Sequence, residues 1–539
     1  MTGRMPPPPT PRRRASAKGG SADLLRDAVR FHKAGELDRA ATLYQRVLKQ
    51  APRQPDALHL LGVIRHQQGD QRRALELIAG ALAEVGDNAA FRNSLGSVLL
   101  AIGRLDEAEA ALRQAIAADP TNAQAHNNLG NALMKRGRPS DAVALYERAI
   151  ALNAGYAEAQ SNLGSAWHRL GRLDEAEQAL RAVLKLAPRH ATAWTNLGLV
   201  HHDRARYDDA LAAYDKALAI DPHHATARAN RAVLLLLLGR FEEGWRDYEG
   251  RWRVAGFTTR PRSFAAPPWN GRPAADQTVF IHAEQGLGSA IQFVRYIPRI
   301  AAGCRRTIVE CQPPLERLFR RSFEDGSGGR VTVAARGGEV PAFDAHAAMM
   351  SLPHLSGTTL ATVPADVPYL KAAEDDVDRW RARLAGDARP RVGLVWAGNP
   401  KHLNDHNRSM PASALAPLVN AGRGTFYGLQ VGSAQGGIAE LPAGRVVDLA
   451  SELKDFAETA AALESLDLVL SVDTAVAHLA GALARPVWLL LPCVPEWRWL
   501  LDRADTPWYP TMRLFRQQDP GDWAGVVDRV GAALAAEWR

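Results

Sequence analysis

Hydrophobic positions follow two different patterns along the 539-residue chain, and the change lies near residue 278. In the first half a Leu-Gly pair recurs every 34 residues, at Leu61-Gly62, Leu95-Gly96, Leu129-Gly130, Leu163-Gly164 and Leu197-Gly198. An alanine follows each glycine by 12 residues, and a large side chain follows that alanine by 4. Small residues at fixed positions allow two helices to approach closely, and the large side chain fills the space between them. The first half is therefore predicted to be a stack of helix pairs.

Prolines mark the ends of several of these units, at Pro52, Pro120, Pro188 and Pro222. Proline ends one helix and is tolerated at the start of the next. A 34-residue period with these features is typical of the tetratricopeptide repeat. The phase predicts six units beginning near Ser21, followed by an altered seventh in which Arg231-Ala232 replaces Leu-Gly. Terminal units depart from a repeat pattern because one face meets a different structure.

Asparagine recurs just before the Leu-Gly position, at Asn128, Asn162, Asn196 and Asn230. The first helix of each pair is expected to line the concave surface of the array. Each amide offers a donor and an acceptor, so this column predicts a groove for an extended peptide. The array resembles the repeat half of eukaryotic O-GlcNAc transferases, in which such a ladder holds the substrate polypeptide. The alternative is that these amides only contact their neighbours within the repeats.

In the second half, short apolar runs alternate with helical stretches. The predicted strands are 278–283, 307–312, 330–335, 391–397, 425–431, 468–473 and 486–491. This alternation predicts parallel sheets that are covered on both faces. Two series of strands, separated near residues 372–390, indicate two Rossmann-like domains, and ligands of such sheets bind beyond the carboxyl ends of the strands. The predicted domains are a tail (1–20), the repeats (21–258) and two Rossmann-like halves (259–375 and 376–539).

Two turns between a strand and a helix carry candidate chemistry. In the first, Gly286 and Gly288 allow a ligand to approach the backbone, and the helix start offers free N–H groups, although such glycines also serve tight packing. In the second, Asp473 or Thr474 can cap a helix, and His478 lies one turn further along the same face. A hydroxyl, a helix N-terminus and an imidazole together predict a pyrophosphate site. The alternative is a capped helix with a packed histidine.

Composition sets further limits on function. Residues 1–20 contain five basic residues and no acid, which accounts for +5 of the formal +8 and leaves +3 for the remainder. We expect a disordered, solvated tail, no nucleic-acid partner and at most peripheral membrane contact. No apolar run reaches the roughly 18–20 residues that span a bilayer, and the start does not look like a secretory signal. Three cysteines without CxxC spacing favour a cytoplasmic protein with no disulfide framework and no metal site.

Several segments of the second half match a known pattern as a set. They are FEEGWRDYEGRW (241–252), EQGLGSAIQFVRYIP (284–298), RVGLVWAGNPKHLNDHNRSMP (391–411), DTAVAHLAGAL (473–483) and PEWRWLLDRADTPWYPTMRLFRQ (495–517). From about Gly239 onwards the chain resembles the ADP-heptose:lipopolysaccharide heptosyltransferase family and its relatives fused to tetratricopeptide repeats.

The resemblance implies an inverting glycosyltransferase of GT-B architecture that uses a nucleotide-sugar as co-substrate and needs no cofactor or metal. It implies that the C-terminal domain holds the donor, with Asp473, Thr474 and His478 at its sugar and phosphates. Arg408, Ser409 and Gln430 would border the same site.

One position departs from the family pattern. An aspartate, the expected general base, follows the glycine-rich turn in the heptosyltransferases, and Ser289 stands there in this chain. Inversion needs a group that takes the acceptor's proton, and a lone hydroxyl is a poor base. Glu284 and His282 lie nearby in sequence, so the candidate catalytic residues are Glu284, His282 and Ser289.

Three functions are compatible with these features. The first is a glycosyltransferase whose repeats select the acceptor, such as a polypeptide. The second is a heptosyltransferase-like enzyme acting on a glycan or a lipid-linked acceptor. The third is a non-catalytic repeat scaffold with a degenerate transferase half. Ser289 favours the scaffold, whereas the intact Asp473, Thr474 and His478 favour an enzyme.

Overall fold

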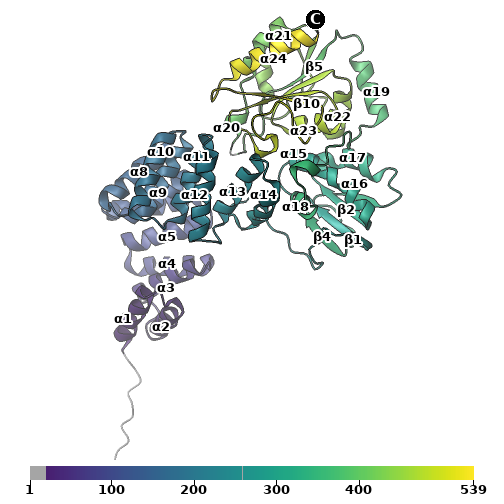
Figure 1. Cartoon of the computed structure of the whole chain (residues 1–539). Helices are drawn as coiled ribbons and strands as arrows, with labels where there is room; N and C mark the ends of the chain where they lie inside the picture. Colours follow the sequence, from purple (N-terminus) through teal and green to yellow (C-terminus); the bar gives the residue numbers. More distant parts are fainter. Residues whose placement is uncertain (1–19, 258, 403, 539) are drawn as a thin grey trace, which may run out of the picture. The chain divides into compact units, whose positions relative to one another are not determined.

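The computed structural model describes residues 20–257, 259–402 and 404–538 (Figure 1). The predicted basic tail lies, apart from Gly20, outside the described residues. The chain forms two compact units, which divide between Arg204 and Ala205. Within the described ranges, no helix combines the length and the apolar character needed to cross a membrane.

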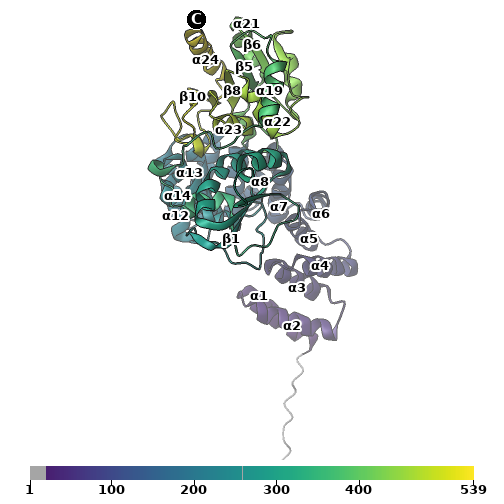
Figure 2. The ribbon, with the colours of Figure 1, turned by 90° about the vertical axis from the view of Figure 1, so that its right-hand side faces the viewer.

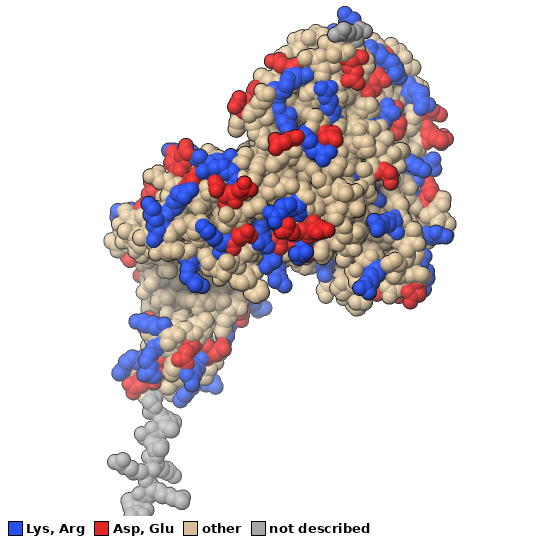
Figure 3. Space-filling model, in the orientation of Figure 1, with Lys and Arg blue, Asp and Glu red and all other residues tan. Residues whose placement is uncertain are grey.

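The first part of the chain is entirely helical, as the 34-residue period predicts. The first helices of the repeats are α1 (Ser21–Lys33), α3 (Pro55–Gln67), α5 (Ala89–Ala101), α7 (Ala123–Lys135), α9 (Ala157–Arg169), α11 (Ala191–Asp203) and α13 (Ala225–Leu237). The second helices are α2 (Leu37–Gln50), α4 (Gln71–Val85), α6 (Leu105–Ala118), α8 (Pro139–Leu152), α10 (Leu173–Leu186), α12 (Tyr207–Ile220) and α14 (Phe241–Tyr248). Helices α12–α14 belong to the second compact unit. Basic and acidic side chains are intermixed on the face shown in Figure 3.

The repeated glycines stand where the two helices of a pair touch. A Cβ on Gly96 would lie 2.5 Å from Cγ of Leu112, and one on Gly130 would lie 2.6 Å from Cε1 of Tyr146. Gly62 and Gly164 meet Ile78 and Leu180 in the same way. The predicted pairing of a small residue with a large one 16 positions later is therefore confirmed.

The second unit continues into an α/β region with two parallel sheets. The smaller sheet has the order β3-β2-β1-β4 and is formed by β1 (Ala274–His282), β2 (Cys304–Cys311), β3 (Val331–Ala335) and β4 (Ala345–Ala348). Its helices are α15 (Leu287–Phe293), α16 (Ile297–Gly303), α17 (Glu316–Phe319) and α18 (Leu352–Leu355). Val279 and Ile281 face the main core, while Phe280 and Ile308 pack under Phe264 on the opposite face.

The larger sheet has the order β10-β9-β8-β5-β6-β7 and is also parallel. Its strands are β5 (Arg391–Val395), β6 (Thr425–Gly428), β7 (Val446–Asp448), β8 (Leu468–Val472), β9 (Val487–Leu491) and β10 (Met512–Arg516). Helices α21 (Ala416–Ala421) and α24 (Trp523–Glu537) cover one face, and α22 (Phe456–Glu464) and α23 (Ala475–Ala482) cover the other (Figures 1 and 2). Two further helices are α19 (Glu374–Arg383) and α20 (Asp405–Arg408).

The seven predicted strands are present, with ends shifted by at most four residues. Three additional strands, β4, β7 and β10, lie at the edges of the sheets and lack the long apolar runs of the central strands. The single helix expected over residues 290–302 is divided into α15, a 3-10 turn at Val294–Tyr296, and α16. Pro298 stands in the first turn of α16, where proline is tolerated because the N–H of that position has no partner within a helix.

Candidate functional site

The carboxyl edge of the larger sheet gathers most of the residues expected to bind a donor. Strands β5, β6, β8 and β9 run parallel, so the segments that follow them emerge at one edge. After β8, Thr474 caps α23: its Oγ1 accepts a hydrogen bond from the N–H of Ala477 at 3.4 Å and lies 3.0 Å from Oγ of Ser471. Asp473 precedes the cap and is almost fully buried.

His478 lies inside this edge and is 3% exposed. Its Nδ1 is 2.9 Å from the hydroxyl of Tyr509, its Nε2 is 3.8 Å from Oδ1 of Asp473, and its ring stacks on Trp499 at 5.2 Å. Burial, with a smaller contribution from the positive Arg498, lowers the pKa of His478 well below its ordinary value. The imidazole is therefore neutral near pH 7, and it packs tightly on the first turn of the capped helix to which it belongs.

The segments after β5 and β6 are held by side-chain contacts to the backbone. Oε1 of Gln430 accepts the N–H groups of Trp396 and Ala397, at 3.2 and 3.0 Å. Oγ of Ser409 accepts the N–H of Gly398 at 2.9 Å. Arg408 donates from Nε to Asp405 at 3.1 Å. Gln430 and Ser409 thus shape the backbone, while Arg408 brings a positive charge to this edge.

The glycine-rich turn of the smaller sheet meets this same edge. A Cβ on Gly288 would lie 3.0 Å from Cδ2 of His478, so glycine permits the close approach of α15 and α23. A Cβ on Gly286 would have no neighbour within 4 Å. Ser289 follows, and its Oγ accepts a hydrogen bond from Nη2 of Arg498 at 3.0 Å.

Glu496 and Arg498, which lie in the segment after β9, complete the cluster. Neither was among the predicted site residues. Arg498 is buried and donates to Ser289, to Gln292 at 2.5 Å and to Oε1 of Glu496 at 2.5 Å. Burial lowers the pKa of Arg498, but the carboxylates of Glu496 and Asp473 more than offset this effect, and the pKa is raised.

The side chain of Glu496 keeps 31% of its surface exposed. Burial and the neighbouring Asp473 raise the pKa of this carboxyl, and Arg498 offsets part of the rise. The sequence contained a usable indication of this site, because Glu496 and Arg498 lie five and seven residues after β9, a buried apolar strand, and parallel sheets bind ligands beyond the carboxyl ends of their strands.

Glu284 has a different environment from Glu496. Its side chain is 0% exposed, and its Oε1 and Oε2 accept hydrogen bonds from Nη2 and Nε of Arg251, at 2.7 and 3.0 Å. Its Oε1 also accepts the N–H of Met350 at 2.9 Å. Both oxygens are thus used to tie the 3-10 segment Glu249–Arg253, which follows α14, to the smaller sheet.

His282 is buried at the end of β1 in a group of aromatic rings. Its ring centroid lies 5.5 Å from Phe264, 6.0 Å from Phe280 and 5.7 Å from His346. Burial, and then the charge of Arg262, lower its pKa to about 3. Its neutral ring therefore serves packing between the sheet and the segment that carries Phe264.

The recurring asparagines join successive repeats. Nδ2 of Asn128 donates to Asn93 at 2.9 Å, and Nδ2 of Asn162 donates to Asn127 and Asn131 at 2.9 and 3.1 Å. Asn128, Asn131 and Asn162 also line a groove of about 450 Å³. Among the residues that the structure describes, no donor contacts the amide oxygens of Asn128 and Asn162. The column therefore contacts neighbouring repeats through its N–H groups and keeps acceptors beside a groove.

The remaining two asparagines lie outside this groove. Nδ2 of Asn196 donates to Oγ of Ser165 at 2.8 Å, which continues the pattern of bonds to the preceding repeat. Asn230 is half-buried on α13 and belongs to the second compact unit.

Family comparisons cover the helical region. A family described as tetratricopeptide repeat matches residues 127–189, 169–225 and 203–248, and one described as TPR repeat matches residues 96–137. The helical region consists of tetratricopeptide repeats. The family described as anaphase-promoting complex, cyclosome, subunit 3 matches residues 33–115. The tetratricopeptide region is thus a repeat scaffold for protein interaction, and it precedes an α/β region of parallel sheets.

One curated relative matches a longer part of the chain. Protein FlbA of Caulobacter vibrioides is 30% identical over 331 residues, which cover 56% of this chain and 54% of that protein. The chain thus spans about half the length of this relative.

Solved structures similar to the chain include repeat proteins. The hetero-tetramer Cut9–Hcn1 of the APC/C is 19% identical, with 40% of this chain and 43% of that chain covered and a TM-score of 0.38. YrrB, a TPR protein with an unusual peptide-binding site, is 26% identical, with 34% and 95% covered and a TM-score of 0.28.

Proposed function

We propose that the α/β region is a glycosyltransferase of GT-B type, which moves a sugar from a nucleotide-sugar to an acceptor selected by the tetratricopeptide repeats. The observation that carries the proposal is the cluster in which Ser289, on α15 after the first strand of the smaller sheet, accepts a hydrogen bond from Arg498 of the larger domain. The neighbouring Gly288 lies against Ala475 and His478 of the capped helix α23. The family resemblance of the same segments supports it.

The donor's diphosphate would bind at the carboxyl edge of the larger sheet. The first turn of α23 presents backbone N–H groups, and a helix N-terminus favours negative charge. Arg408 and Arg498 add two positive charges at this edge. These groups would stabilise the charge that develops on the leaving diphosphate, which is usually the largest catalytic contribution.

Glu496 would act as the general base in place of the missing aspartate. Both oxygens of Glu284 accept hydrogen bonds from buried donors, and its side chain is fully buried. Both oxygens of Glu496 also accept hydrogen bonds, from Nη1 and the backbone N–H of Arg498, but its side chain keeps 31% of its surface exposed. The carboxylate would take the proton of the acceptor hydroxyl as its oxygen bonds to the anomeric carbon. The bond from that carbon to the diphosphate would break on the opposite side, and the nucleoside diphosphate would leave.

The repeats would supply the acceptor, and a polypeptide suits them best. The amide oxygens of Asn128 and Asn162 border a groove, where they can accept hydrogen bonds from backbone N–H groups of an extended chain.

Donor binding is the first test. The full chain would be screened by thermal shift against a panel of UDP-, GDP-, ADP- and CMP-sugars, because a ligand of the folded state raises the melting temperature. We expect one donor to give a shift that Arg408→Ala abolishes. Arg381→Ala, an exposed arginine on α19, is the matched control and should keep the shift. No shift with any donor, or an unchanged shift in Arg408→Ala, would contradict the donor site.

Turnover separates the enzyme from a scaffold. Release of nucleoside diphosphate would be followed with the bound donor and a peptide array as acceptor. Glu496→Gln should keep donor binding and lower the rate by about 100-fold or more, as loss of a general base does. Glu339→Gln, an exposed glutamate after β3, should leave the rate unchanged. Donor binding by the wild type without any turnover would favour the non-catalytic scaffold.

A further inference from the structure

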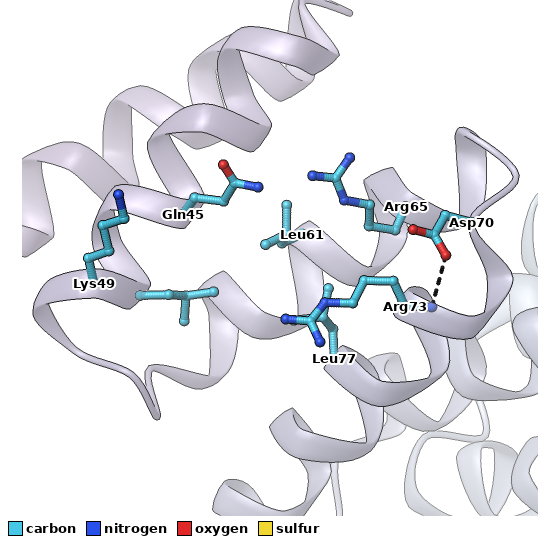
Figure 4. A pocket seen from close by; sticks show the side chains of 8 residues that line it. Gln45, Lys49, Leu61, Arg65, Asp70, Arg73 and Leu77 are labelled. Carbon is cyan, nitrogen blue, oxygen red and sulfur yellow. Dashed lines mark hydrogen bonds between the residues drawn. The ribbon is translucent and has the colours of Figure 1, made fainter.

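A groove of about 470 Å³ lies beside α2, α3 and α4, in the first two repeats (Figure 4). Arg65 and Arg73 extend into it from one side, and Gln45 and Lys49 of α2 face them from the other. Its apolar lining is formed by Leu48, Leu61 and Leu77. The volume lies within the range of ligand sites, about 300–1,000 Å³.

The charges of this groove depart from the rest of the array. The position of Arg65 is apolar in four later repeats, where it is occupied by Leu99, Leu133, Trp167 and Leu235. The position of Arg73 is acidic in five later repeats, where it is occupied by Glu107, Asp141, Glu175, Asp209 and Glu243. The second repeat therefore replaces an apolar side chain and an acid by two arginines.

A second exchange, at the residue before the helix, changes how the charge at the position of Arg73 is paired. In the third repeat Arg104 precedes the helix and binds Glu107 with two hydrogen bonds, so the two charges cancel. In the second repeat the order is reversed: Asp70 precedes the helix and accepts the backbone N–H of Arg73 at 3.1 Å. This carboxylate is used for capping.

The guanidinium groups of Arg65 and Arg73 form their side-chain hydrogen bonds with exposed partners. Arg73 donates to Glu76 at 2.7 Å, and Arg72 binds the same carboxylate. Arg65 donates to the neutral Gln68 at 2.7 Å. Lys49 is exposed. With Arg65, Arg73 and Lys49 against Asp70, the residues that line the groove carry a net charge of +2.

We infer that this groove binds an acidic peptide segment that carries a large apolar side chain. The leucines would contact the apolar side chain, while carboxylates on either side of it would pair with Arg65, Arg73 and Lys49. The groove shares no lining residue with the groove of Asn128 and Asn162. It is a separate docking site for a protein partner, and it does not depend on the proposed transferase activity.

The test uses the full chain and three fluorescein-labelled peptides in fluorescence anisotropy. The probe is Asp-Glu-Leu-Leu-Glu-Asp, the uncharged counterpart is Asn-Gln-Leu-Leu-Gln-Asn, and the counterpart without an apolar side chain is Asp-Glu-Gly-Gly-Glu-Asp. We expect saturable binding of the probe, binding at least tenfold weaker for both counterparts, and weakening between 50 and 300 mM salt because the pairs are near the surface.

Variants locate the binding on the protein. Arg65→Glu combined with Arg73→Glu should weaken probe binding at least tenfold, and Arg148→Glu, an exposed arginine on α8, should not. Arg65→Leu restores the residue type of the later repeats, so it should fold normally and still weaken binding. The inference is overturned if the probe does not saturate, if the uncharged peptide binds equally well, or if Arg148→Glu weakens binding as much as the double variant.

Discussion

One arginine–carboxylate pair of the tetratricopeptide repeats and one of the α/β region lie in opposite environments. In the repeats, Arg104 pairs with Glu107 three residues away, and the two side chains are 47% and 55% exposed. In the α/β region, Arg251 pairs with Glu284, which is 33 residues away, and the two side chains are 2% and 0% exposed. The chemical groups are the same, but one pair orders a single helix start and the other joins distant segments.

This difference predicts how each region responds to the loss of one partner. A pair near the surface is screened by water and contributes at most about 1 kcal/mol. A buried charge left without its partner costs several times more, because it remains out of water with no compensating charge. The loss of one partner should therefore cost little at the exposed pair of the repeats and much more at the buried pair of Arg251 and Glu284.

The largest effect is expected from Arg251→Ala. The variant leaves the buried Glu284 unpaired, and we expect the free energy of unfolding of the α/β region to fall by about 3–5 kcal/mol. Urea unfolding followed by tryptophan fluorescence measures this change. Arg240→Ala, which breaks the exposed pair with Glu243, should cost less than about 1 kcal/mol. Equal losses in the two variants would break the comparison.

The next largest effect concerns pH. The pKa of His282 is lowered to about 3 in the folded protein, so below pH 6.5 the unfolded chain takes up a proton that the folded protein does not. Stability must then fall as the pH falls, by about 1.4 kcal/mol per pH unit until pH 3 is approached. His282→Phe, which suits the surrounding rings, should remove this contribution.

The advantage of His282→Phe over the wild type should therefore grow by about 2 kcal/mol between pH 7.5 and pH 5. Urea unfolding at the two pH values measures it. His406→Phe, at an exposed histidine, should follow the wild type at both. A constant difference between His282→Phe and the wild type would show that the buried ring accepts a proton in the folded state.

A methyl group at the contact of the two sheets sharpens the comparison further. Gly288→Ala places a Cβ 3.0 Å from His478, which is held by Tyr509 and Trp499 and has little room to move. We expect a loss of about 1–3 kcal/mol, typical of overpacking. Gly286→Ala, two residues away, meets nothing within 4 Å and should change the melting temperature much less. Similar melting temperatures for the two variants would rule out the close contact of α15 and α23.

The smallest effect is expected within the repeats. Asn162→Ala removes two hydrogen bonds to the preceding repeat, and we expect a loss of about 1 kcal/mol because the site is half-buried and water can replace part of the bonding. Circular dichroism during thermal unfolding measures it. Glu147→Ala, exposed on α8, is the control and should change little. A loss as large as that of Arg251→Ala would mean that the uncharged hydrogen bonds between repeats contribute as much stability as a buried ion pair.

The two regions also differ in how much of their structure could be predicted from the sequence. The helix pairs of the repeats were predictable in detail. Gly130 and Tyr146, which touch, are 16 residues apart, and the same contact recurs at the same phase in other repeats. In the α/β region, the long apolar runs identified the central strands, whereas β4, β7 and β10 escaped because edge strands bury fewer apolar residues. The cap by Thr474 was predictable, because its three-residue spacing to the N–H of Ala477 is local.

The candidate site shows where sequence reasoning stopped. Glu284 and His282 were expected as catalytic groups because they lie near the glycine-rich turn. In the structure Glu284 is bound by Arg251, and His282 packs in an aromatic cluster. Arg498 lies 209 residues after Ser289 and touches it. No spacing along the chain indicates that contact.

The sequence by itself determined the repeat, the parallel character of both sheets and the ends of strands at which a ligand can bind. These features rest on the 34-residue period and on short apolar runs that alternate with helical stretches, which are local properties of the chain. Only the tertiary structure decided that the salt bridge of Glu284 is fully buried, whereas Glu496, which pairs with Arg498, keeps 31% of its side chain exposed. Burial and charge at a side chain depend on segments hundreds of residues away, and these come together only when the chain is packed.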